Sequence, residues 1–99
     1  MFVADLHNDL VQRAMIGEDV SKFTNHGHTD LFRLIESCID LEILIIWVST
    51  IDKSQSAFQI ANEMYDKLEE LSISNDLVDI PKDLNGIINN KKNNLLSIP

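Results

Sequence analysis

Residues 3–10, VADLHNDL, place Asp5, His7 and Asp9 two positions apart at the end of a short apolar stretch. Side chains two apart in a strand point to the same side, so His7 and Asp9 can converge on one point. An imidazole nitrogen and a carboxylate oxygen are both zinc ligands, and a complete zinc site has three or four ligands. The pattern predicts part of a metal site, with Asp5 as a third ligand or a support for His7. The alternative is a surface histidine followed by an aspartate that caps the next helical turn.

A second group of polar side chains lies in HGHTD, residues 26–30. His26, His28 and Asp30 are also two positions apart and could form a metal cluster of their own. The interpretation that we favour is a polar loop in which Asp30 caps the following helix and complements its dipole.

The spacing of apolar residues along the chain predicts the strands and helices that position these side chains. We expect strands near 2–7, 41–49, 76–80 and 94–98, helices near 30–38, 54–73 and 81–89, and a helical turn within 8–16. The helix at 54–73 has an apolar stripe and a capping box of Ser56 and Gln59, and Pro81 suits the first turn of the helix at 81–89. The run ILIIWV is continuously apolar, as in strands of parallel sheets. This alternation predicts an α/β fold with parallel strands.

The composition and net charge of the chain argue against several kinds of binding partner. The chain has 99 residues, 44% of them hydrophobic, and a net charge of -8, which argues against non-specific binding to nucleic acid or anionic membrane. ILIIWV is far shorter than the ~20 residues of a membrane helix. The single cysteine, Cys38, cannot form an internal disulfide, and we expect it to be buried as a small hydrophobic residue. We expect a soluble, cytoplasmic protein with no membrane span and no nucleic-acid partner.

Two motifs in order, DLHNDL and GHTDLFRLIES, followed by an apolar strand that carries Trp47, resemble the membrane (renal) dipeptidase family of zinc peptidases. The matching residues are Asp5, His7, Asp9, Leu10, His28, Thr29, Asp30, Leu31, Arg33 and Leu34. The resemblance implies that residues 1–99 are the amino-terminal portion of a (β/α)8 TIM-type barrel, the fold of a metal-dependent hydrolase that cleaves dipeptides. It implies that His7 and Asp9 bind one of two zinc ions, and that His28 and Asp30 cap a helix and hold the barrel mouth.

Three departures qualify the resemblance. Phe32 stands where the family has proline, ESCIDLE replaces a glycine-rich turn, and Pro99 stands where the family has a glutamate that bridges both metals. We therefore expect the 99-residue chain alone to be an incomplete, inactive fragment, and we assign it no catalytic residue. Two other interpretations stay open: a non-catalytic short protein that associates with itself or with an intact dipeptidase through exposed strands, and a small acidic α/β domain of unrelated role.

Overall fold

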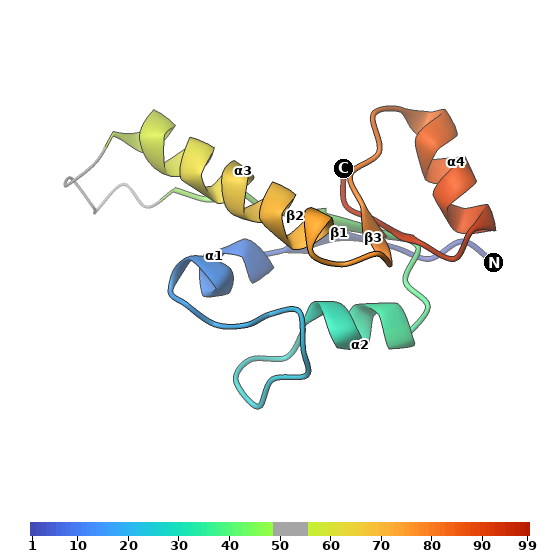
Figure 1. Ribbon diagram of the computed structural model, residues 1–99, viewed down its shortest axis with the longest axis horizontal. Coiled ribbons are helices and arrows are strands. Elements are labelled where there is room, and N and C mark those ends of the chain that lie inside the picture. The colour runs from blue at the N-terminus through green and yellow to red at the C-terminus, as the bar shows by residue number, and fades with distance from the viewer. Residues whose placement is uncertain (49–55) are drawn as a thin grey trace.

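The computed structural model describes residues 1–48 and 56–99, in which helices alternate with short strands (Figure 1). The elements are β1 (Ala4–Asn8), α1 (Leu10–Met15), α2 (Leu31–Glu36), β2 (Leu41–Leu44), α3 (Ala57–Ile73), β3 (Val78–Asp79), α4 (Leu84–Lys92) and β4 (Leu96–Ser97). The helical turn predicted within 8–16 is present as α1. Residue 49 of the predicted strand at 41–49 and residues 54–55 of the predicted helix at 54–73 lie outside the described ranges.

The four strands form one parallel sheet in the order β1-β2-β4-β3. Its parallel pairing confirms the predicted α/β class. In a (β/α)8 barrel each strand is followed by a helix and then by its neighbouring strand. The pair β1-β2 suits that arrangement, whereas β2 pairs with β4 and the intervening β3 lies outside β4 at the edge of the sheet. The observed sheet is thus a four-stranded α/β sheet in which the last two strands are out of sequential order.

The pairing of β1 with β2 is irregular. Asp5 lies opposite Glu42, but Asn8 lies opposite Leu44, so three steps along β1 match two steps along β2. This is a β-bulge, which changes the direction of the side chains that follow it. The ladder ends where the Ile45 amide donates to the Asn8 carbonyl at 2.8 Å, because β1 then turns into α1. The observed β2 is shorter than the predicted strand for this reason.

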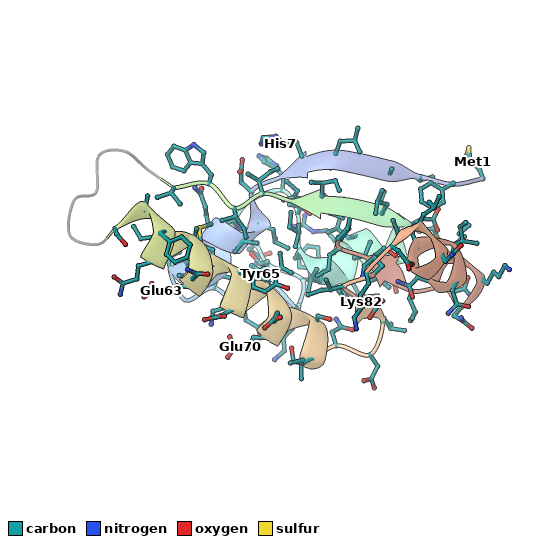
Figure 2. The ribbon with its side chains drawn as sticks, turned by 90° about the horizontal axis from the view of Figure 1, so that it is seen from above. Met1, His7, Glu63, Tyr65, Glu70 and Lys82 are labelled. Carbon is teal, nitrogen blue, oxygen red and sulfur yellow. The ribbon has the colours of Figure 1, made fainter. Side chains whose placement is uncertain are left out.

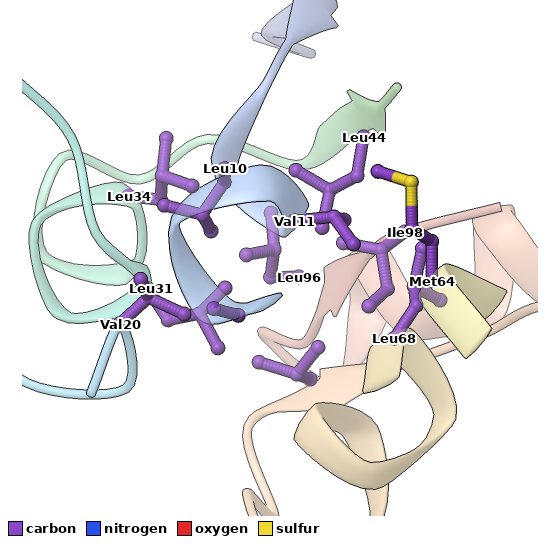
Figure 3. Close-up of a cluster of buried hydrophobic side chains, with 12 residues drawn as sticks. Leu10, Val11, Val20, Leu31, Leu34, Leu44, Met64, Leu68, Leu96 and Ile98 are labelled. Atoms are coloured by element: carbon purple, nitrogen blue, oxygen red, sulfur yellow. The ribbon is translucent and has the colours of Figure 1, made fainter. Parts of the chain in front are cut away.

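Helices α1, α2 and α3 bury their apolar side chains against one face of the sheet (Figure 3). The buried apolar residues are Leu10, Val11, Ala14, Val20, Leu31, Leu34, Leu44, Met64, Leu68, Val78, Leu96 and Ile98. Full burial of one such aliphatic side chain contributes about 1.5–3 kcal/mol. The alternation of Leu96, Ser97 and Ile98 shows that β4 is covered on both faces, because all three are buried.

Helix α4 is joined to the sheet by a polar contact. The Asn90 side-chain amide donates to Asp79 Oδ2 at 2.9 Å and to Ser97 Oγ at 3.0 Å. Successive side chains of a strand point to opposite faces, so Ser97 points away from the core that contains Leu96 and Ile98. Helix α4 therefore packs on the other face of β4.

The predicted bounds of the last helix and of the last two strands need correction. The helix predicted at 81–89 begins at Leu84, because the Asp83 side chain accepts the Gly86 amide at 2.8 Å as the N-cap. Pro81 therefore precedes the helix and does not lie in its first turn. The short strands β3 and β4 likewise cover only the centres of the predicted segments.

Cys38 is exposed, so the prediction that it is buried is wrong. It has a positive φ of 58° at the position after the C-cap of α2. The Cys38 amide donates to the Ile35 carbonyl at 3.1 Å, and the Ile39 amide donates to the Leu34 carbonyl at 3.2 Å. These two bonds form a Schellman motif, in which the residue with positive φ is usually glycine. The motif directs the Cys38 side chain away from the core.

We expect Cys38→Gly to raise the free energy of unfolding by roughly 0.5–1 kcal/mol, because glycine adopts a positive φ without the clash of a Cβ atom. Cys38→Ala is the matched control, since it removes the thiol but keeps the Cβ atom. Urea denaturation of both variants and the wild type measures the difference. A glycine variant no more stable than the alanine variant would contradict this account.

Candidate metal site

His7 lies near the carboxyl end of β1, an edge strand of the sheet (Figure 2), and Asp9 follows directly after that strand. His7 Nε2 lies 3.4 Å from Asp9 Oδ2, and their side chains are 70% and 52% exposed. The structure thus brings together the two residues whose spacing suggested a metal site. Both donor atoms are open to solvent and lie close enough to bind one cation.

The Asp9 carboxylate is free of the capping role that the alternative interpretation gave it. Asp9 occupies the N-cap position of α1 but makes no side-chain capping hydrogen bond. The neighbouring Asn8 accepts the Leu10 amide through Oδ1 at 3.0 Å instead. Asp9 can therefore turn its carboxylate toward His7.

A shallow hollow of about 370 Å³ borders the pair. It is lined by His7, Asp9, Gln12, Ile45 and Trp47. The hollow follows the carboxyl ends of β1 and β2, the edge at which parallel α/β folds place their ligands. It combines an imidazole, a carboxylate and an amide with an aromatic wall.

The donor set of this site is small. In the described ranges, no group of three or more histidine, cysteine, aspartate or glutamate side chains has the geometry to hold a metal ion. Asp5 does not join the pair as a third ligand, and its Oδ1 accepts the His7 backbone amide at 3.4 Å. His7 and Asp9 suit zinc in chemical type but supply only two of the three or four ligands that zinc takes.

The HGHTD segment forms a helix cap. Asp30 is fully buried and accepts the Arg33 amide at 2.7 Å, the Arg33 Nε–H at 2.7 Å and the Thr24 amide at 3.1 Å. Burial opposes the charge of Asp30, but the bonds from Arg33 and Thr24 hold its pKa below the usual value. The interpretation of Asp30 as a helix cap is confirmed.

The loop between α1 and α2 is organised around Arg13. Its guanidinium donates to Glu18 Oε2 at 2.8 Å and to the carbonyl oxygens of His26 and Thr29. His26 thus supports the loop through its backbone, and the His28 side chain is exposed. Neither histidine belongs to a metal-ligand group in the part of the chain that the structure describes.

Glu42 is a buried charged residue close to the site, and sequence analysis missed it. It lies on β2 and is 0% exposed, with Oε1 accepting the Asn8 Nδ2–H at 2.7 Å. Burial and the nearby Asp5 charge together raise the pKa of Glu42 to about 7, against the opposing effect of the Asn8 hydrogen bond. A glutamate flanked by Leu41, Ile43 and Leu44 was the available signal, because a charge inside an apolar strand is unusual.

Neither family models, curated proteins nor solved structures gave a match to this chain. In the described ranges, the helices are too short or too polar to cross a membrane. The geometry of the chain itself is therefore the basis for a functional assignment.

We expect Gly27→Ala to lower the free energy of unfolding by about 2 kcal/mol, from the strain at positive φ and from contact with Arg13. Gly27 has a φ of +74°, and a Cβ atom there would lie 2.7 Å from Arg13 Cζ. Gly17→Ala is the matched control, since its φ is +96° but a Cβ atom would meet nothing within 4 Å. Thermal and urea unfolding should show a smaller loss, about 1 kcal/mol, for the control. Equal losses would mean that the Arg13 contact is unimportant.

Proposed function

We propose that His7 and Asp9 bind a zinc ion as part of a dipeptide-hydrolysing site, in the amino-terminal part of a (β/α)8 barrel. The observation that carries the proposal is the 3.4 Å approach of His7 Nε2 to Asp9 Oδ2 at the carboxyl end of β1. The resemblance of DLHNDL and GHTDLFRLIES to zinc dipeptidases suggests the reaction, which is hydrolysis of dipeptides.

The chain's own residues prepare the pair in three ways. The bulge in β1 places His7 and Asp9 at the end of the strand, and Asn8 takes over the capping of α1. The hollow beside the pair offers Gln12 and Trp47 as polar and aromatic surfaces for a ligand. Bound zinc supplies a Lewis acid that polarises a carbonyl and lowers the pKa of a water molecule. The described residues contribute two zinc ligands, fewer than a zinc site takes. We therefore propose that catalysis requires further ligands besides His7 and Asp9.

We expect the wild-type chain to bind one zinc ion weakly, and His7→Ala/Asp9→Ala to reduce the affinity at least about tenfold. Competition with a chromophoric chelator at neutral pH measures this. His28→Ala is the matched control, because His28 is an exposed histidine outside the pair, and its affinity should equal that of the wild type. Equal zinc binding by the wild type and the double variant would exclude the proposed site.

A second candidate function is association through the exposed strand β1. In the sheet that the structure describes, β1 is an edge strand with one row of backbone groups that face no other strand, and its Leu6 is 69% exposed. Such an edge can pair with another chain.

For this candidate, sedimentation velocity over a range of concentrations should show a defined oligomer, and Leu6→Lys should shift it to monomer. Ile73→Lys, at an 84% exposed position at the end of α3, is the control and should leave the oligomer intact. A wild-type chain that stays monomeric at all concentrations would end this candidate.

A further inference from the structure

The Glu42 carboxyl is buried beneath the edge of the sheet and takes no part in the proposed metal site. Its Oε1 has the Asn8 donor, whereas Oε2 is buried with no hydrogen-bond partner in the part of the chain that the structure describes. An ionised carboxylate with one oxygen unpaired in an apolar core is costly. The position therefore calls for a neutral acid, whose hydroxyl is a donor.

An acceptor for that hydroxyl lies on the neighbouring strand. Asp5 is directly opposite Glu42 in the β1–β2 register, and its charge acts on the Glu42 carboxyl. Two adjacent carboxyl groups do not both ionise readily. Asp5 is exposed and its Oδ1 accepts the His7 amide at 3.4 Å, whereas Glu42 is fully buried, so burial opposes a charge on Glu42 in particular. Glu42 then holds the proton.

We propose that Glu42 is a neutral carboxylic acid that donates its Oε2 proton to the Asp5 carboxylate, and that this proton ties the edge strand β1 to β2. Removal of the proton leaves two facing carboxylates, one of them buried, and so destabilises the pairing at the bulge. The interaction of Glu42 with Asp5 therefore makes the attachment of β1 to β2 dependent on pH. It goes beyond the proposed zinc site, because Glu42 accepts from Asn8 and lies opposite Asp5, and neither of these residues is a proposed ligand.

The pH range follows from the surroundings of Glu42. Burial and Asp5 raise its pKa from 4.5 to about 7 in the folded protein. The folded state thus binds this proton more tightly than the unfolded state does. The resulting stabilisation is complete below about pH 4.5 and is lost as the pH rises through about 7.

Other charged groups near the core are engaged elsewhere. From α1 and α2, Arg13 pairs with Glu18 and Arg33 pairs with Asp30. β4 and α3 contribute apolar side chains to the core, and the Asn8 amide and the nearby Thr29 hydroxyl are uncharged. Asp5 is the ionisable neighbour that acts on Glu42 in the described ranges.

The direct test is a carboxyl-carbon NMR titration of the wild-type chain without metal. Glu42 should titrate with a midpoint near 7, shifted well above its ordinary value of 4.5. Asp5→Asn removes the facing charge and should move the midpoint to lower pH. A Glu42 midpoint near 4.5 in the wild type would overturn the proposal, whether or not any variant folds.

The second test is urea unfolding from about pH 5 to about pH 8. Glu42→Gln keeps a donor for Asp5 and an acceptor for Asn8 but cannot ionise, so it should remove most of the loss of stability that the wild type shows at the upper end. Glu36→Gln, at an exposed position on α2, is the matched control and should keep the wild-type pH dependence. An unchanged pH dependence in Glu42→Gln would contradict the proposal. Both tests are independent of zinc, so failure of the metal site would leave their outcome unaffected.

Discussion

The amino-terminal half of the structure depends on the side chain of Asn8. Its Nδ2 donates to Glu42 at 2.7 Å and lies 3.4 Å from the Thr29 hydroxyl, while its Oδ1 accepts the Leu10 amide. One residue thereby joins β2, the end of the long loop and the start of α1. These three segments are distant in sequence, and an amide side chain can bond to all of them because it both donates and accepts. Asn8 lies between His7 and Asp9, so these hydrogen bonds also fix the backbone that presents His7 and Asp9 to solvent.

The buried polar residues fall into two kinds. Asp30 and Asn90 each have several hydrogen-bond partners. Asp30 joins the start of α2 to the loop before it, and Asn90 joins α4 to β3 and β4. Such satisfied groups specify one arrangement of the chain at little net cost. Glu42 differs, because one of its oxygens lacks a partner when the group is ionised. A proton on Glu42 Oε2 turns that oxygen into a donor, so it no longer needs a partner that donates to it.

Local signals in the sequence were sufficient for the presence of the helices and for the N-caps of α2 and α3. Ser56 accepts the Gln59 amide at 3.1 Å, as the capping box predicts, and Asp30 caps α2. These bonds join residues three apart, so the sequence pattern contains both partners. The pairing of His7 with Asp9 was also predictable, since it depends on residues two apart.

Features that depend on distant partners could not be predicted in this way. The place of β4 between β2 and β3 is decided by the packing of whole segments, and the short length of β2 by the end of its partner β1. The exposure of Cys38 follows from a positive φ, for which a sequence without glycine gives no sign. The position of Glu42 in an apolar strand marks it as unusual, but its role depends on Asn8 and Asp5, which are distant in sequence.

The bulge in β1 links the two proposed sites physically while keeping their chemistry separate. Asp5, before the bulge, faces Glu42 across the strand pair, whereas His7 and Asp9 meet at the solvent-exposed end of the strand. A regular strand would have kept Asp5, His7 and Asp9 on one side, and all three would then have competed for the same cation. The extra residue divides them, so that one carboxylate accepts a proton from β2 and the other stays available to His7. Any ligand of the exposed pair therefore acts on a strand whose attachment depends on a buried proton.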